Sequence, residues 1–107
     1  MPYYYRIIRG PHLRRELFLS DREAGIPRPD NPELVARWEG FSVFATEAQA
    51  RRMIRKRPNL GDHLAELHIR PDANVRVERT GRNSPGHHTV YGDADELLLL
   101  VQRVIPV

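Results

Sequence analysis

The 107-residue chain contains no cysteine and a single lysine, and its longest apolar run, from Leu97 to Val101, has only the length of a strand. The absence of cysteine excludes disulfides, cysteine-ligated zinc sites and a thiol nucleophile. A membrane-spanning helix needs roughly 18 apolar residues in succession, so the sequence predicts no span. The start, Met1-Pro2-Tyr3, is unlike a secretory signal peptide. We therefore expect a cytoplasmic protein, and the length predicts a single domain over residues 1–107.

The basic excess is confined to one stretch of the chain. Lys and Arg together number 17 against 14 Asp and Glu, which gives a formal net charge of +3. Outside residues 51–57 the chain carries 12 cations against 14 acids, a net charge of −2. This stretch is either the solvated end of a helix or a surface for an anionic partner such as RNA. Its five cations are Arg51, Arg52, Arg55, Lys56 and Arg57.

Apolar spacing and turn residues predict an α+β domain of about six strands, with two to three short helices in the N-terminal half. Caps support two of the helices: Asn31 with Pro32 opens one, and Thr46 with Gln49 forms a capping box for the next. Residues 92–96 read as a turn or a single helical turn. Helices are expected at residues 13–25, 32–39 and 47–57. Strands are expected at residues 3–10, 41–45, 63–69, 75–80, 87–91 and 97–107.

Two adjacent histidines follow a turn over residues 84–87 that fits type II, with Pro85 and Gly86 at its centre. Neighbouring residues of a strand point to opposite faces, so His87 shares a polar face with Thr89 and Tyr91, while His88 shares an apolar face with Val90. Because one regular strand cannot direct both imidazoles into one site, we expect no metal there. His87 is either an acid or base in a cleft or a hydrogen-bonded residue without catalytic role.

Three segments, in order, resemble the ADP-ribosyltransferase superfamily, particularly the catalytic domains of poly(ADP-ribose) polymerases and diphtheria-type toxins. The first segment is IIRGPHLRRELFLSDREAGIP, in which a strand ends at Arg9-Gly10. The second, GFSVFATEAQARRM, is similar to the family's Gly-x-x-Phe-Ala strand and the helix after it. The third, HHTVYGDADELLLLVQRVIPV, is similar to the penultimate and closing strands. Together they cover about half of the chain, and the resemblance implies a split antiparallel or mixed sheet.

The resemblance also implies a binding site for NAD as a substrate. The Gly10 backbone would pair with the nicotinamide amide, and Arg9 would contact phosphate or ribose, since Arg forms charge-assisted bonds to phosphate oxygens. Phe44 would form part of the cleft wall. Ser42 and Thr46 would stand at hydroxyl positions of the family, although Thr46 already has a role as a helix cap. The strand that ends at Arg9 is expected to lie beside the strand that begins at His87, with Arg9 and His87 opening onto one cleft.

The third motif places His87 where transferases of the family carry a glutamate. That glutamate stabilises the positive charge that develops as nicotinamide leaves, and a neutral histidine accepts a hydrogen bond without supplying the anion. RNA 2′-phosphotransferases, a branch of the family, work with histidine and arginine instead.

Three functions therefore stay open. The first is a minimal ADP-ribosyltransferase-like protein that recognises NAD or a related nucleotide and transfers ADP-ribose or cleaves NAD. The second is a metal-independent ribonuclease or phosphotransferase in which His87 is base or acid and Tyr91 assists. The third is a non-catalytic protein- or nucleic-acid-binding module on the same fold.

Overall fold

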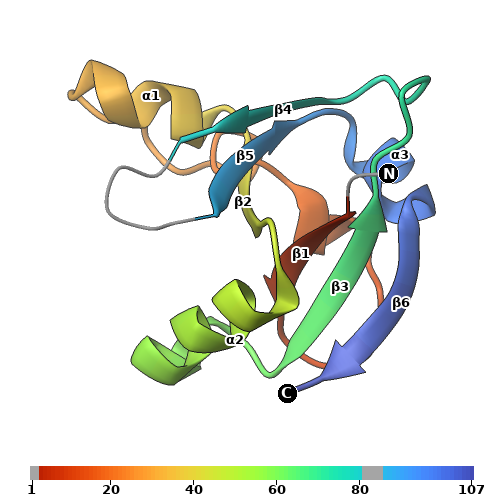
Figure 1. Cartoon of the computed structure of the whole chain (residues 1–107). Coiled ribbons are helices and arrows are strands. Elements are labelled where there is room, and N and C mark those ends of the chain that lie inside the picture. The colour runs from red at the N-terminus through yellow and green to blue at the C-terminus, as the bar shows by residue number, and fades with distance from the viewer. Residues whose placement is uncertain (1–2, 81–85) are drawn as a thin grey trace.

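One six-stranded antiparallel sheet organises the chain, with strand order β4-β5-β2-β1-β3-β6 (Figure 1). The computed structural model describes residues 3–80 and 86–107, and it confirms the predicted α+β class. Two short 3₁₀ helices, η1 and η2, accompany three α-helices. The elements in chain order are β1 (Tyr3–Ile8), η1 (Arg15–Phe18), α1 (Pro32–Trp38), β2 (Phe41–Phe44), α2 (Glu47–Lys56), η2 (Pro58–Leu60), β3 (His63–His68), β4 (Arg76–Arg79), β5 (His87–Tyr91), α3 (Ala94–Leu99) and β6 (Val101–Pro106).

Helices pack on both faces of the sheet because alternate strand residues are apolar on each side. The face under α2 buries a small cluster made of Phe44, Ala50, Ile54 and Leu64. The opposite face buries a larger cluster, to which η1 contributes Phe18 and α3 contributes Leu97. The other buried members of that cluster are Ile8, Phe41, Val43, Ala65, Leu67, Ile69, Val90, Ala94 and Leu100.

The sheet is split between its two central strands. β1 pairs with β3 over six consecutive residues, whereas β1 and β2 are in register only at Tyr5 with Phe44 among the described residues. In Figure 1, β4, β5 and β2 lie towards the upper left, and β1, β3 and β6 lie towards the lower right. The backbone ladder is therefore interrupted on the side of Ile7 and Ser42, and space opens between the two halves.

The helix predicted for residues 13–25 is wrong, because only η1 is helical there. Hydrogen bonds between Ser20 and Glu23 explain why the chain is not helical after η1. The Ser20 backbone N–H and hydroxyl both donate to the Glu23 carboxylate, and the Ser20 hydroxyl accepts from the Glu23 backbone N–H. Such local side-chain bonds offer the backbone an alternative to helical hydrogen bonds.

The prediction that the helices lie in the N-terminal half holds for α1 and most of α2 but fails for α3, which occupies part of the apolar run assigned to the last strand. Asp93 caps this helix: its carboxylate accepts from the backbone N–H groups of Asp95 and Glu96. The cap sets the helix start, and Leu97 is then buried against η1. A short apolar run does not distinguish a buried helix from a buried strand, so the capping residue was the better signal.

The predicted cap at Asn31 is confirmed in full, and the predicted capping box of Thr46 with Gln49 is confirmed in part. Asn31 accepts from the Glu33 backbone N–H, with Pro32 at the first helical position. Thr46 accepts from the Gln49 backbone N–H, but the Gln49 side-chain oxygen is buried without a partner among the described residues. Of the predicted type II turn, Ser84 and Pro85 lie outside the described residues, and Gly86 has the positive φ of 80° that such a turn requires at its third position.

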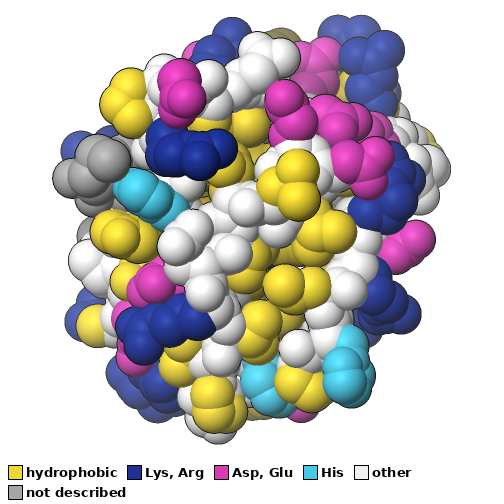
Figure 2. Space-filling model, turned by 90° about the vertical axis from the view of Figure 1, so that its right-hand side faces the viewer, with side chains coloured by type: hydrophobic (Ala, Val, Ile, Leu, Met, Phe, Trp, Pro, Cys, Tyr) yellow, Lys and Arg dark blue, Asp and Glu magenta, His cyan; other side chains and the backbone are white. Residues whose placement is uncertain are grey.

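The face formed by α3 and β6 exposes hydrophobic side chains beside a group of acidic ones (Figure 2). Leu99 is 81% exposed there, and Val107 is 50% exposed. β6 is an edge strand of the sheet. Among the described residues, no helix is long and apolar enough to cross a membrane.

We predict that Gly61→Ala destabilises the fold by about 2 to 3 kcal/mol, within the usual range for an overpacked site. A Cβ at Gly61 would collide with the Ile8 carbonyl oxygen. That oxygen cannot easily move, because it accepts a hydrogen bond from the Asp62 N–H at 3.1 Å. Urea unfolding measures the loss. The exposed neighbour Asn59→Ala is the control and should lie within about 0.5 kcal/mol of the wild type; an equally stable Gly61→Ala would contradict the steric explanation.

Candidate functional site

The split between β1 and β2 holds the candidate site, a cavity of about 450 Å³. Strands supply one wall, and the end of α2 with η2 supplies another. A volume of this size lies in the range of small-molecule sites. The lining residues are Arg6, Ile7, Arg37, Ser42, Phe44, Met53, Arg57, Leu60 and His87.

Arg6 bridges the split. Its Nη1 donates to the Ser42 carbonyl at 3.0 Å, and its Nε donates to the Leu17 carbonyl at 3.2 Å. The guanidinium also lies 4.9 Å from the centre of the Phe41 ring. Desolvation lowers the pKa of Arg6 to about 10, so the group stays charged at neutral pH. A guanidinium has five N–H donors, and the described residues accept from two of them, which leaves three for a ligand.

The cavity is cationic. Arg6, Arg37 and Arg57 all line it, and no Asp or Glu is found among its described lining residues. The charge of Asp21, which lines the adjoining space, raises the pKa of Arg6 and partly offsets the loss of solvation. Clustered guanidinium groups without carboxylates attract phosphate or carboxylate anions, and a partly buried setting screens that attraction less than bulk water does.

A second cavity of about 370 Å³ adjoins the first and shares Arg6, Arg37 and Ser42 with it. Most of its remaining wall is apolar and comes from α1 and the segment before it, and Asp21 adds a carboxylate to this wall. There the indole of Trp38 donates to the Ile26 carbonyl and lies under the Arg22 guanidinium, 5.5 Å from it. The shared arginines thus separate a basic compartment from one that offers flat and apolar surfaces, among them Ile26, Pro27, Pro29, Leu34 and Trp38.

His87 enters the basic cavity from β5 and is only 7% exposed. Its Nδ1 lies 3.0 Å from the Thr80 hydroxyl oxygen, which in turn lies 2.7 Å from the Thr89 hydroxyl. The ring stands edge-on to Phe44, with centroids 5.5 Å apart. Because Nδ1 is engaged by Thr80 inside the sheet, Nε2 is the ring atom left for the cavity.

Burial is the main reason that the pKa of His87 falls to about 4, and the nearby charges of Arg37 and His88 lower it further. The imidazole is therefore neutral at pH 7 and offers one hydrogen bond at Nε2 without a formal charge. The predicted separation of the two histidines is confirmed. His88 lies on the other face, edge-on to Tyr4 with centroids 5.2 Å apart, and its Nδ1 is 2.8 Å from the Gly86 carbonyl oxygen.

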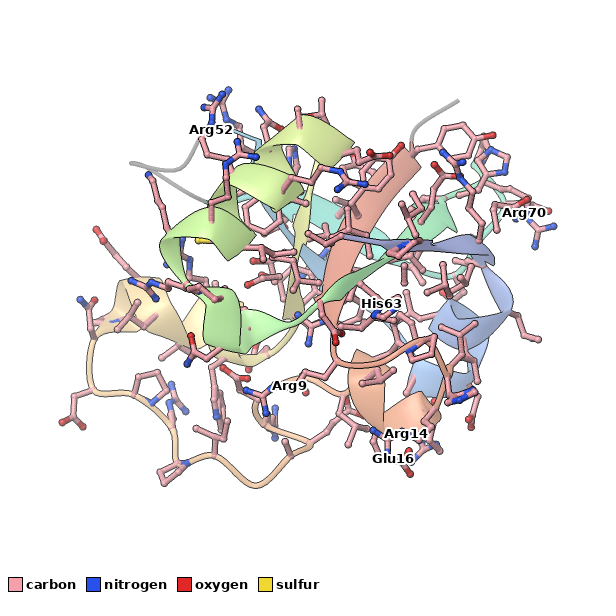
Figure 3. The ribbon with its side chains drawn as sticks, turned by 90° about the horizontal axis from the view of Figure 1, so that it is seen from below. Arg9, Arg14, Glu16, Arg52, His63 and Arg70 are labelled. Atoms are coloured by element: carbon pink, nitrogen blue, oxygen red, sulfur yellow. The ribbon has the colours of Figure 1, made fainter. Side chains whose placement is uncertain are left out.

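The prediction that the Arg9 strand lies beside the His87 strand is wrong, because β2 separates β1 from β5. Arg9 lies beyond the end of β1, and its Nε and Nη2 donate to the Asn59 carbonyl at 3.2 and 2.7 Å (Figure 3). The Gly10 N–H donates to the Asp62 carboxylate at 2.8 Å. Neither residue lines the cavity, so the pair assigned to NAD makes contacts within the protein instead.

The other expected site residues divide between the cavity and structural positions. Ser42 and Phe44 line the cavity as expected. Thr46 caps α2 and does not line the cavity. Tyr91 shares the strand face of His87, but its hydroxyl donates to the Ala36 carbonyl at 2.8 Å, and its ring lies 4.4 Å from the Arg76 guanidinium.

Sequence reasoning missed the three arginines that define the cavity. Arg6 had a signal, since it is a cation inside an otherwise apolar strand and such a residue needs partners when it is buried. Arg57 was noticed only as part of the basic run. Arg37, a polar residue of a short helix, had no distinguishing signal. Among the described residues, no cluster of three or more His, Asp or Glu side chains could hold a metal ion.

Comparison of the chain with protein-family models, with curated proteins and with solved structures finds no match.

We predict that His87 makes the fold less stable as the pH falls from 6.5 towards 4. The folded-state pKa of about 4 lies below the ordinary value of 6.5, so the unfolded chain binds the proton more tightly in this window. The stability contribution is complete above pH 6.5 and lost below pH 4, and it is at most on the order of 3 kcal/mol.

Urea unfolding at several pH values measures this loss for the wild type and for His87→Gln, which keeps a hydrogen-bonding side chain but does not titrate. The difference in unfolding free energy between the two should change across the window. Parallel curves for the two proteins would show that His87 is not held neutral by the fold.

Proposed function

We propose that this chain is an ADP-ribosyltransferase-like domain that binds NAD or a related nucleotide in the basic cavity at the split of the sheet. One observation carries the proposal: the half-buried guanidinium of Arg6 has three unused N–H donors at a cavity that Arg37 and Arg57 also line. In this proposal the three arginines contact the phosphates, since Arg matches phosphate oxygens in geometry and charge.

The apolar surfaces on either side of the arginines favour a nucleotide over a simple inorganic anion. In the basic cavity, Phe44, Met53 and Leu60 provide apolar wall. In the adjoining cavity, Trp38 and two prolines provide a flatter one. A ligand with an anionic centre and ring systems on both sides fits this order, and a dinucleotide has that layout.

The resemblance to ADP-ribosyltransferases supports this ligand in some respects. The interruption between β1 and β2 agrees with the expected split sheet, and Ser42 and Phe44 lie in the cavity. The anchoring role moves from Arg9 to Arg6, which lies three residues earlier, within β1, and lines the cavity. Gly10 keeps no free N–H for nicotinamide, because Asp62 accepts from it.

The chemistry of the cavity favours recognition over cleavage of NAD. Departure of nicotinamide leaves a positive charge on the ribose, which an anionic side chain would stabilise. His87 is neutral, and the described lining of the basic cavity contains no carboxylate. Asp21 lines the adjoining cavity, where its charge acts on Arg6. We therefore propose tight binding of the nucleotide, with transfer of ADP-ribose or cleavage of NAD slow at best.

Phosphotransfer or ribonuclease chemistry is the second candidate, and the position of His87 favours it. A neutral imidazole nitrogen faces a cavity that three arginines line. In the tautomer whose Nδ1–H donates to Thr80, Nε2 is a proton acceptor beside groups that stabilise charge on a phosphate. The low pKa makes His87 a weak base and leaves it unprotonated at pH 7, so it could not serve as the acid without a change of environment.

We predict that NAD raises the melting temperature of the wild-type protein and binds in isothermal titration calorimetry. A ligand at about 100 times its dissociation constant adds about 2.7 kcal/mol, which is several degrees for a domain of this size. Arg37→Gln combined with Arg57→Gln should abolish the shift, because the cavity loses two of its three cations. Arg14→Gln combined with Arg70→Gln removes the same charge from exposed sites elsewhere and should keep the shift.

The choice of ligand separates the candidate functions. A shift with NAD that the cavity variant loses supports the proposal. A shift with nucleoside phosphates or short RNA but not with NAD, lost in the cavity variant, supports phosphotransfer or ribonuclease chemistry. An NAD shift that survives in the cavity variant, or no shift with any of these ligands, would overturn the proposed site and favour a non-catalytic binding module.

A further inference from the structure

We propose that the outer face of α2, continued by Arg57 into the basic cavity, binds a single-stranded polynucleotide. The phosphates would follow Arg52, Arg55 and Lys56 along the helix and reach the cavity at Arg57. The inference goes beyond the proposed function, because a nucleotide can bind in the cavity whether or not a polynucleotide binds on the helix.

The cations of α2 divide between two environments. Ala50 and Ile54 are buried and fix which side of the helix faces the sheet. Arg52, Arg55 and Lys56 are exposed on the remaining surface, and Figure 3 shows Arg52 projecting away from the body of the domain. Arg51 is different, because its Nε donates to Glu47 at 2.9 Å and its Nη2 to the Pro106 carbonyl at 3.3 Å.

The exposed cations of α2 have no partner within the part of the chain that the structure describes. None of Arg52, Arg55 and Lys56 takes part in an ion pair or a side-chain hydrogen bond there. Other surface arginines behave differently, as Arg15 pairs with Asp95 and Arg22 with Glu39. This helix face is thus a local concentration of uncompensated positive charge, the feature on which binding to a phosphate backbone depends.

Arg57 joins this face to the cavity. It is the last residue of the basic run and caps α2 through its backbone N–H, which donates to the Met53 carbonyl. The side chains of Arg57 and Met53 both line the basic cavity. Positive charge therefore continues from the helix surface to Arg6 and Arg37, and the adjoining cavity adds the Trp38 ring as an apolar surface for a base.

Two other anionic partners fit less well. A helix that lies on a membrane inserts its apolar side into the lipid, but the apolar side of α2 is buried against the sheet. An acidic peptide could pair with the exposed cations of α2. Its binding would not need the positive charge to continue into a cavity with an apolar wall. The acidic first turn of α3 lies on the face shown in Figure 2, so a polyanion would be directed away from that side.

The test measures fluorescence anisotropy of labelled single strands of about 12 nucleotides, as RNA and as DNA of the same sequence. We expect binding that weakens steeply between about 50 and 200 mM salt. Arg52→Glu with Arg55→Glu should weaken it at least about tenfold and reduce the slope of log K against log salt by roughly 1.4, or 0.7 per lost cation. Arg14→Glu with Arg70→Glu makes the same change in net charge and should leave affinity and slope as in the wild type.

Circular dichroism checks that both double variants fold; if the first does not, Arg52→Gln with Arg55→Gln replaces it. Equal losses in both double variants would overturn the proposal, because only net charge would then matter. So would the absence of binding to either polynucleotide, and so would binding to anionic vesicles in the absence of polynucleotide binding. Loss of NAD binding in the cavity variant tests the proposed function separately, and the two results can differ.

Discussion

The guanidinium of Arg6 holds together the two halves of the sheet where backbone pairing between β1 and β2 stops. It donates to the Ser42 carbonyl of β2 and to the Leu17 carbonyl of η1, so one side chain connects both halves with the segment that covers them. Removing a cation from water costs free energy unless its hydrogen-bonding groups find partners. Arg6 meets this requirement only in part, with two carbonyls and the Phe41 ring, and its lowered pKa records the remaining cost.

The N–H donors of Arg6 that have no partner among the described residues make the cavity a candidate site for an anion. Among the described residues, three donors of Arg6 remain unused. Arg37 in α1 and Arg57 just after α2 add positive charge, and an anion would pair with all three groups. The same charge helps to hold His87 neutral, because Arg37 disfavours a second cation beside it. The proposed binding of phosphate and the low pKa of His87 are thus two effects of one arrangement. A neutral His87 does not supply the anion on which transferases that carry a glutamate depend.

Much of the fold could be predicted from the local sequence, but only part of the candidate site could be. Strand alternation correctly placed His87 and His88 on opposite faces, and Asn31 and Thr46 correctly marked two helix starts. The prediction of the strand order was wrong because contacts between residues far apart in the sequence determine which strands pair. Placing β2 between β1 and β5 is a choice of long-range pairing, and it brings Arg6 rather than Arg9 to His87. The Ser20–Glu23 bonds and the Asp93 cap are local, but they had to be weighed against apolar spacing that suggested other elements.

Nuclear magnetic resonance of the arginine side chains can show which guanidinium groups meet the ligand. In protein labelled with ¹⁵N-arginine, the Nε–Hε signals are assigned by single Arg→Lys substitutions and followed as NAD is added. If the split of the sheet is the binding site, the signals of Arg6, Arg37 and Arg57 shift together along one binding curve, and that of Arg9 stays in place. A shift confined to Arg9, or signals of Arg6 and Arg57 that do not respond while NAD binds, would contradict it.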